Sequence, residues 1–180
     1  MKVFDTEIPD VKIIEPTVFT DNRGYFFEAF NAQKFSALFG FTPNFCQLNE
    51  SGSELGTIRG LHLQTEPHAQ AKLVRVVSGR ALDVVVDCRK SSPHFGKHVT
   101  IDISEENKRQ VWIPRGFAHG FQVMSKFCTL SYQVDAPYSP HAQKSINAFD
   151  NFLKIGWCQE NEVKMSSQDE CAPNFLEIYG

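Results

Sequence analysis

The sequence lacks an apolar run long enough to cross a membrane, and its N-terminus, MKVFDTEIPD, lacks the basic-then-apolar pattern of a secretory signal. A membrane-spanning helix needs about 20 consecutive apolar residues, so no membrane partner is expected. The chain also lacks an excess of positive charge, since its net charge is −3. It therefore has no overall attraction for the phosphates of a nucleic acid, and no nucleic-acid partner is expected.

Cysteine is sparse, and no two cysteines form a CxxC pair. An odd number of widely separated cysteines argues against both a disulfide framework and a thiolate zinc site. We expect each one to be a small buried hydrophobic residue in a reduced, cytoplasmic protein. The five are Cys46, Cys88, Cys128, Cys158 and Cys171.

The composition is that of an ordinary globular domain, because 42% of the 180 residues are hydrophobic and 22% are charged. No linker, low-complexity stretch or internal repeat divides the chain. We expect a single domain over residues 1–180. Its barrel core is expected over about residues 40–135, with N-terminal strands in residues 1–30 and a C-terminal wrap over residues 136–180.

Short β-branched and aromatic runs separated by turn residues dominate the chain. Near the N-terminus they predict strands at residues 11–14 and 25–30, with a turn at residues 20–24 between them. Two short connections, at residues 78–80 and 125–126, predict hairpins between the strands that they join. The remaining predicted strands are 72–78, 81–87, 98–103, 110–113, 120–124 and 127–134.

Helix signals are few. Asn31 is a favourable N-cap and Gly40 a favourable stop, which predicts a short helix with Phe35, Leu38 and Phe39 on one face. Many short strands with almost no helix predict a β-sandwich or barrel. The last forty residues are expected to wrap around the outside, with a helix or two, through the apolar anchors Phe149, Phe152, Ile155, Trp157 and Phe175.

Polar residues interrupt several of the apolar strands. In the segment RGLHLQ, alternation places His62 and Gln64 on one face of a strand. If that face lines the inside of a barrel, one cavity would hold Arg59, His62, Lys72, Asp83 and His119. Such a cluster is costly to bury and is usually functional. Taken singly, each residue has a plainer reading, such as a satisfied core histidine, a snorkelling lysine or an aspartate paired with arginine.

A wider pattern of motifs runs through the chain: DNRGYFFE, QLN, RGLHLQ, AKLVR, DCRKSSP and PRGFAHGF, which begin at residues 21, 47, 59, 71, 87 and 114. In this order and spacing the sequence resembles the dTDP-4-dehydrorhamnose 3,5-epimerase family over about residues 1–175. The resemblance implies a mainly β fold, a cupin-type β-barrel (jelly roll) with a few short helices. It also implies an enzyme that uses no metal and no cofactor.

The resemblance assigns roles to individual residues. His62 matches the general base of the family, and Asp169 matches the carboxylate that orients and charges it. Tyr132 matches the general acid on the opposite face of the sugar, and Lys72 the cation beside the developing enolate oxygen. The residues expected to bind the substrate are Arg23, Phe26, Glu28, Gln47, Asn49, Arg59, Asp83, His119 and Tyr138.

The chemistry suits these residue types. A 4-keto group acidifies the protons at C3 and C5, so a base of near-neutral pKa such as histidine suffices. A carboxylate behind the base fixes its tautomer, a buried lysine stabilises the oxyanion, and arginines match a diphosphate. The expected function is inversion of C3 and C5 of dTDP-4-dehydro-6-deoxy-D-glucose to dTDP-4-dehydro-L-rhamnose, in dTDP-L-rhamnose biosynthesis.

The sequence departs from the family pattern in places. Leu48 and Glu50 stand where the family commonly has Asp and His, and Gln133 replaces a common Lys. The segment AFDN at residues 148–151 replaces the usual W-N-D-P. These departures keep open an alternative function, a mono-epimerase that inverts only C3 or C5 of a related dTDP-4-keto-6-deoxy sugar.

Three other functions can be weighed on the same residues. A metal-dependent cupin usually offers an HxH pair, but position 64 is Gln. A sugar-nucleotide 3,4-ketoisomerase would have a different histidine arrangement and no role for Tyr132. A non-catalytic nucleotide-sugar-binding cupin would have lost His62, Tyr132 or Asp169, and all three are present.

The family resemblance also implies a homodimer that exchanges N-terminal strands between its two barrels. On that arrangement residues 23–28 would reach the active site of the partner. The apolar N-terminal strands suit an exchange, and they suit an intramolecular sheet equally well.

Overall fold

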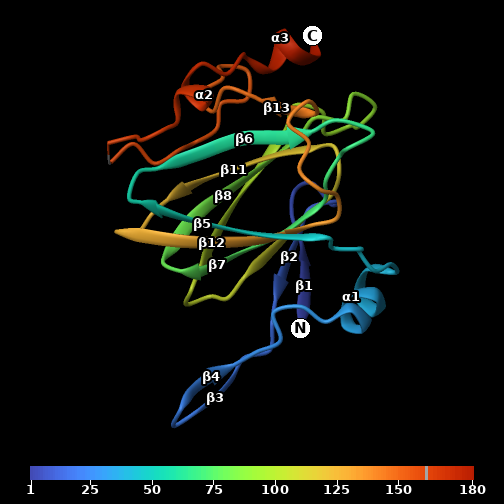
Figure 1. The fold of residues 1–180 in the computed structure, drawn as a ribbon, viewed down its shortest axis with the longest axis vertical. Coiled ribbons are helices and arrows are strands. Elements are labelled where there is room, and N and C mark those ends of the chain that lie inside the picture. Colours follow the sequence, from blue (N-terminus) through green and yellow to red (C-terminus); the bar gives the residue numbers. More distant parts are fainter. Residues whose placement is uncertain (161) are drawn as a thin grey trace.

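The computed structural model describes residues 1–160 and 162–180, and within them the protein is mainly β with three short helices (Figure 1). Two sheets face each other. One has six strands in the order β1-β2-β10-β7-β12-β5, and the other has five in the order β13-β6-β11-β8-β9. This arrangement confirms the predicted jelly-roll fold class with few helices.

The strands of the two sheets are short, as the turn spacing predicted. In the six-stranded sheet they are β1 (Lys2–Asp5), β2 (Lys12–Glu15), β10 (Gln110–Ile113), β7 (Lys72–Ser78), β12 (Phe127–Val134) and β5 (Gln47–Glu54). In the five-stranded sheet they are β13 (Gln143–Ser145), β6 (Ile58–Gln64), β11 (Phe117–Val123), β8 (Arg80–Asp87) and β9 (His98–Ser104).

The two predicted hairpins are wrong. β7 pairs with β10 and β12, whereas β8 pairs with β9 and β11, so the turn at residues 78–80 leads from one sheet to the other. The turn at residues 125–126 does the same between β11 and β12. A Cβ at Gly79, where φ is +84°, would lie 2.2 Å from the carbonyl oxygen of Phe127. The two crossings therefore pack against each other, and only Gly fits at their contact.

The N-terminal segment leaves the sandwich as a separate hairpin. β3 (Phe19–Asp21) and β4 (Gly24–Phe26) pair only with each other, and they project from the body of the molecule in Figure 1. The turn predicted at residues 20–24 lies at the tip of this hairpin. The strand predicted over residues 25–30 ends early, because β4 stops at Phe26.

Helix α1 (Ala32–Phe39) has the predicted ends. The side chain of Asn31 accepts a hydrogen bond from the Lys34 N–H at 3.0 Å, and Gly40 adopts a φ of +76°. Phe35 is buried, as expected. Leu38 is exposed, so it does not belong to the buried apolar face of the helix that was predicted to include it. The helix lies beside the barrel in Figure 1.

Three apolar cores hold these layers together. The largest fills the space between the two sheets, with Val74, Val85 and Leu130 among its buried residues. A second lies on the outer face of β6 and β8, where the C-terminal segment covers it. A third packs α1 against the other sheet through Phe35 and Trp112, whose rings meet edge-on at 5.3 Å. Burial on both faces of each sheet fixes the strand register.

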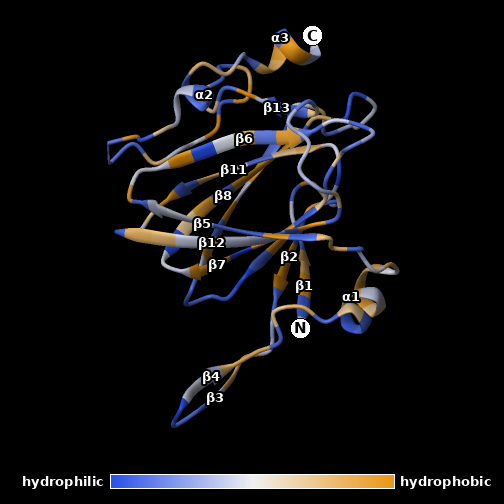
Figure 2. Ribbon diagram, in the orientation of Figure 1, coloured by the Kyte–Doolittle hydropathy of each residue, from blue (hydrophilic) through white to orange (hydrophobic). Residues whose placement is uncertain are grey.

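The C-terminal segment contains α2 (Ser167–Glu170) and α3 (Phe175–Tyr179), and much of α3 is hydrophobic in Figure 2. Of its five predicted anchors, Trp157 and Phe175 are buried and Ile155 is partly buried. Phe149 and Phe152 are exposed, but Phe152 still stacks on Phe175, so the prediction of an anchor is wrong for Phe149.

The cysteines are all free, but they do not share one environment. Cys88 and Cys128 are buried as predicted, Cys158 is intermediate, and Cys46 and Cys171 are exposed. The expectation of burial is therefore wrong for Cys46 and Cys171, which lie in loops that the apolar cores do not cover. No helix within residues 1–160 and 162–180 has the length and apolar character needed to span a membrane.

Candidate active site

Four strand positions that face the space between the sheets carry polar side chains. Their neighbours two residues away along the same strands belong to the central apolar core, so alternation points all four side chains inward. Each interrupts an apolar strand, which is costly unless the group has a partner or a task. The four are Lys72 on β7, Asp83 on β8, His119 on β11 and Tyr132 on β12.

A β-bulge adds Arg59 and His62 to this inward face. His119 pairs with His62, but Phe121 pairs with Arg59, so three steps on β6 oppose two steps on β11. The extra residue lets Arg59 and His62 both reach the cavity, which strict alternation forbids. Gly60 makes the bulge possible, because a Cβ there would lie 2.6 Å from the Cα of Gly120.

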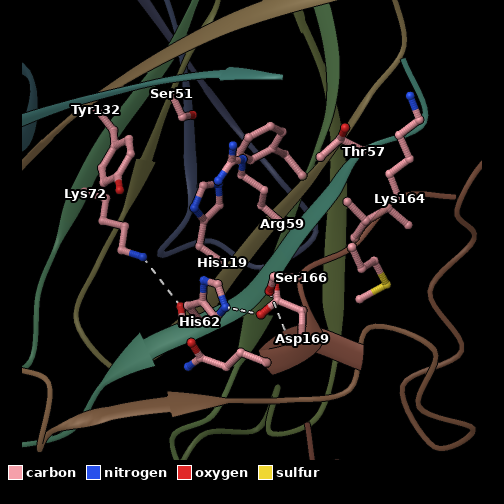
Figure 3. A pocket seen from close by; sticks show the side chains of 14 residues that line it. Ser51, Thr57, Arg59, His62, Lys72, His119, Tyr132, Lys164, Ser166 and Asp169 are labelled. Atoms are coloured by element: carbon pink, nitrogen blue, oxygen red, sulfur yellow. Dashed lines mark hydrogen bonds and ion pairs between the residues drawn. The ribbon is translucent and has the colours of Figure 1, made fainter. Parts of the chain in front are cut away.

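These residues line a cavity of about 470 Å³ between the two sheets, which residues 164–169 help to enclose (Figure 3). Arg59, His62, Lys72, His119 and Tyr132 converge there, as the sequence predicted for the first four. The full lining is Ser51, Thr57, Ile58, Arg59, His62, Lys72, His119, Phe121, Tyr132, Lys164, Met165, Ser166, Gln168 and Asp169.

The shortest polar contact in the cavity joins His62 and Asp169. The imidazole Nε2 lies 2.5 Å from Asp169 Oδ1, and the second carboxylate oxygen accepts the Gly60 N–H at 3.3 Å. Asp169 lies on α2, and its N–H donates to the Ser166 side chain at 3.2 Å. Asp169 is thus held by its own helix and by β6, so the aspartate fixes the orientation of the His62 ring.

Electrostatics favours a charged Asp169. Burial alone would raise the pKa of this carboxyl, but the hydrogen bond from His62, its charge when protonated and the Gly60 N–H together hold the pKa below its usual value. Asp169 is therefore a carboxylate at neutral pH, with Oδ1 placed against the His62 ring. The side chain of His62 is 33% exposed toward the cavity, which leaves its other nitrogen accessible.

Lys72 lies deep in the cavity on the side of His62 away from Asp169 (Figure 3). Burial lowers its pKa to about 8, while the charge of Asp83 acts in the opposite direction. Its ammonium group makes one long contact, 3.5 Å to the carbonyl oxygen of His62. Donors of the ammonium thus remain available to a ligand.

Tyr132 faces the cavity from the six-stranded sheet, which also carries Lys72, and the two side chains lie near each other in Figure 3. Burial raises the pKa of its phenol, and the charge of Arg59 partly offsets that effect. The phenol is accordingly protonated at neutral pH and able to donate a proton. His62 and Tyr132 therefore approach the cavity from two different sheets.

A second histidine–aspartate pair joins the cavity wall to the core behind it. His119 Nε2 is 2.7 Å from Asp83 Oδ1, and both side chains are buried. Asp83 does not itself line the cavity, so its predicted place among the cavity residues is wrong. It lies behind His119 and acts on the cavity through that ring and through the charge of Lys72.

A second cavity, of about 300 Å³, adjoins the first and shares His62, Lys72 and Tyr132 with it. Two predicted binding amides, Gln47 and Asn49, line it from β5. The exposed ring of Tyr138 lines it from the loop after β12. The remaining lining residues are Leu63, Gln64, Gln70 and Gln143.

Three predicted binding residues do not reach either cavity. Arg23 and Phe26 lie on the projecting hairpin, where Arg23 pairs with Asp21 at 2.5 Å. Glu28 contacts Lys34 and Asn31 at the start of α1. Within one chain these three side chains are remote from His62.

Sequence reasoning missed several lining residues. Ser51 continues the period of two that begins at Gln47 and Asn49, so that alternation could have found it. Lys164 and Gln168 lie in a C-terminal segment with no regular period, and no sequence signal placed them at the cavity. Among the described residues, no group of three or more His, Cys, Asp or Glu side chains is arranged to hold a metal ion.

Comparisons with known proteins agree with one another. A sequence profile of a family described as dTDP-4-dehydrorhamnose 3,5-epimerase matches residues 5–177. An enzyme of that name from Shigella flexneri is 48% identical over 177 residues, which cover 98% of this chain and 97% of the relative.

Solved structures give the same result. The chain is similar to a dTDP-4-dehydrorhamnose 3,5-epimerase from Elizabethkingia anophelis, with a TM-score of 0.94, 45% identity, and coverage of 100% of this chain and 99% of that one. It is also similar to a 3,5-epimerase from Legionella pneumophila in complex with dTDP-4-keto-L-rhamnose. That TM-score is 0.95 at 42% identity, with coverage of 98% and 94%.

Proposed function

The chain belongs to the dTDP-4-dehydrorhamnose 3,5-epimerase family, and from this premise we propose which residues carry out each step. It is an isomerase that inverts C3 and C5 of dTDP-4-dehydro-6-deoxy-D-glucose to give dTDP-4-dehydro-L-rhamnose. The observation that carries the proposal is the 2.5 Å contact between His62 and Asp169 in a cavity that also holds Lys72 and Tyr132.

His62 is the base in this proposal. Its Nε2 faces Asp169, so its Nδ1 is the nitrogen available to remove the proton from C3 or C5 of the sugar. Removal of that proton leaves the electron pair delocalised into the 4-keto group as an enolate. The Asp169 carboxylate stabilises the imidazolium that forms, as in other histidine–aspartate pairs.

Lys72 stabilises the enolate. Its ammonium is buried and, within residues 1–160 and 162–180, makes a single long contact, so the developing oxyanion supplies a strong acceptor. A charge in a dry cavity interacts more strongly with an oxyanion than it would in water. The attraction grows as negative charge moves onto the oxygen, which lowers the barrier.

Tyr132 returns the proton. It reaches the cavity from β12, whereas His62 reaches it from β6 in the facing sheet. A proton donated by the phenol to the face opposite His62 inverts the carbon, and the tyrosinate then regains a proton from solvent while His62 loses one. Because C3 and C5 both flank C4, the same enolate oxygen serves both inversions.

The nucleotide occupies the second cavity in this proposal. The exposed ring of Tyr138 offers a stacking surface for a pyrimidine, and Gln47 and Asn49 offer amides for its carbonyl and N–H groups. Arg59, whose guanidinium is held by Ser53 Oγ at 2.9 Å, is suited to the diphosphate. His119 completes the sugar cavity, positioned by Asp83.

We also propose a homodimer in which the β3–β4 hairpin reaches the active site of the other subunit. The hairpin exposes Phe19, Tyr25 and Phe26 and pairs with no other strand of its own chain, which is unfavourable unless another surface covers it. On this arrangement Arg23, Phe26 and Glu28 bind the substrate of the partner. We further infer one epimerase domain over residues 1–180, and a cytoplasmic location on the basis of the free cysteines.

Solvent exchange tests the proposed chemistry. The enzyme is incubated in heavy water with dTDP-4-dehydro-6-deoxy-D-glucose, and deuterium at each carbon is followed by NMR, with His62→Ala as the control. Deuterium at both C3 and C5 that the variant loses supports the proposal. Exchange at one carbon alone would mean a mono-epimerase, and no exchange with the wild-type enzyme would overturn the assignment of substrate.

A further inference from the structure

Two loops border the second cavity. One, over residues 65–71, joins β6 to β7, and the other, over residues 135–142, joins β12 to β13 and carries Tyr138. Tyr138 is 55% exposed, so packing restrains its ring less than it would a buried side chain. Whatever orders this loop therefore decides where the ring lies.

The side chain of Gln64 joins the two loops. Its Nε2 donates to the carbonyl oxygen of His68 at 2.6 Å and to that of Pro137 at 3.2 Å. Its Oε1 accepts the N–H of Ser139 at 2.7 Å. The side chain is only 5% exposed, and its contacts lie on both sides of Tyr138 in sequence.

Two other amides also bond the backbone of this loop, one before Tyr138 and one at Tyr138 itself. Gln70 Nε2 donates to the carbonyl oxygen of Ala136 at 2.6 Å, and Gln47 Oε1 accepts the N–H of Tyr138 at 3.2 Å. Each of these makes one contact with the loop, and both residues are less buried than Gln64. Gln64 is thus the central support, because it alone contacts the residues on both sides of Tyr138.

We propose that Gln64 is a positioning residue that sets the affinity for the nucleoside by holding the Tyr138 loop. This inference rests on the proposed function, in which Tyr138 stacks on the pyrimidine. Position 64 needs a side chain with two donors and one acceptor, which an uncharged amide provides. A glutamate lacks both donors and would place a charge beside two carbonyl oxygens.

The physical effect is preorganisation. A loop that is already in its bound conformation loses less conformational entropy when the nucleoside binds. Replacement of Gln64 by Leu removes all three contacts, so the free loop becomes more mobile. We expect the Kd for dTDP to rise about tenfold or more, whereas kcat at saturating substrate stays within about threefold.

Two probes separate this role from a general structural one. Inorganic pyrophosphate has no nucleoside, so its affinity should be equal in Gln64→Leu and in the wild type. Gln122→Leu is a matched control, since Gln122 is a buried strand glutamine that also bonds a distant loop, through both the N–H and the carbonyl of Cys158. That control should leave the Kd for dTDP unchanged.

A double-mutant cycle supplies the decisive measurement, by calorimetric titration with dTDP. Because Gln64 acts through Tyr138, the double variant Gln64→Leu/Tyr138→Ala should bind dTDP no more weakly than Tyr138→Ala alone, within about twofold. Fully additive losses would overturn the proposal, as would an unchanged Kd in Gln64→Leu. If Gln64→Leu does not fold, Gln64→Glu, which keeps the volume and loses both donors, decides by the same criteria.

The outcomes also distinguish this inference from the function on which it rests. If the wild type neither epimerises the dTDP-sugar nor binds dTDP, the proposed function fails first. If the wild type does both and Gln64→Leu retains its affinity for dTDP, only the inference about Gln64 fails.

Discussion

At His62, the contact with Asp169 decides which nitrogen of the imidazole is available to the sugar. The carboxylate holds one nitrogen at 2.5 Å and leaves the other toward the cavity. An asparagine at position 169 would preserve the shape of the side chain but remove the negative charge that stabilises the imidazolium. The geometry of the base therefore depends on the Asp169 carboxylate as well as on the strand that carries His62.

Asp169→Asn is expected to lower kcat by about 10²- to 10⁴-fold with a much smaller change in KM, because the loss falls on the charged transition state. Steady-state kinetics with the dTDP-sugar measures it. Glu170→Gln is the matched control, since Glu170 is the exposed neighbour on the same helix. An Asp169→Asn enzyme with wild-type kcat would mean that His62 works without its carboxylate.

Lys72 predicts a pH dependence. Burial lowers its pKa to about 8, and the ammonium form is the one that stabilises the enolate. Its charge is complete well below that value and is lost as the pH rises through it, so kcat/KM should fall on the alkaline side of about pH 8. In Lys72→Arg the group stays charged, and the alkaline fall should disappear even if the rate is lower. A fall of unchanged midpoint in Lys72→Arg would assign it to another group.

Individual site residues could be predicted from the sequence to different degrees. His62, Lys72 and His119 stand out as polar residues among apolar strand residues, whereas Tyr132 and Asp169 were added by the family resemblance. Arg59 could not be placed by alternation, because its orientation depends on a bulge that the contact of Gly60 with Gly120 allows. A bulge depends on a neighbouring strand, so residues 58–64 alone do not contain that information.

Among the elements, those with local signals were predicted correctly. The limits of α1 follow from Asn31 and Gly40, whose effects act within one helical turn. The predicted hairpins failed because strand pairing depends on distant partners: β8 pairs with β11, and β7 with β12. A short turn keeps the next strand close to the previous one, but it does not decide whether the two strands pair. Here each turn leads the chain into the facing sheet.

The β3–β4 hairpin predicts complementation between subunits. If its Arg23 serves the partner, His62→Ala and Arg23→Ala enzymes should each be nearly inactive, yet a refolded equimolar mixture should regain up to about a quarter of wild-type activity. Half of the dimers would be mixed, and each would contain one site with both residues intact. Activity in the mixture no greater than the mean of the two variants would contradict the arrangement.

The C-terminal elements predict a separation of stability from chemistry. Phe175 of α3 is fully buried and stacks on Phe152 at 5.6 Å between ring centroids. Phe175→Ala should reduce the free energy of unfolding by about 3–5 kcal/mol, because it leaves a cavity in the second core. Denaturant unfolding measures the loss.

The exposed neighbour Leu176 provides the control for that loss. Leu176→Ala should change the free energy of unfolding by no more than about 0.5 kcal/mol. Equal losses in the two variants would mean that α3 does not anchor the C-terminal segment as described. At denaturant concentrations where both variants are still folded, kcat should equal that of the wild type, since neither side chain lines the cavity.

For the whole molecule, the jelly roll explains why the site forms where it does. The space between the two sheets holds an apolar core, and beside it the inward positions become polar and line the cavity. Strands from both sheets thereby face one cavity from opposite sides. The fold class was predictable from many short strands with little helix, whereas the projection of residues 19–26 away from the body was not, because no local signal separates a docked hairpin from a free one.

In the proposed mechanism, a base on one sheet and an acid on the other act on opposite faces of the same sugar. Tyr132→Phe in heavy water tests it most directly, with deuterium in the recovered substrate and the yield of inverted product measured together by NMR. His62 should continue to exchange the substrate proton in this variant, while inversion falls by about 10²-fold or more because the second donor is missing. Loss of exchange in parallel with inversion, or inversion at the wild-type rate, would contradict it.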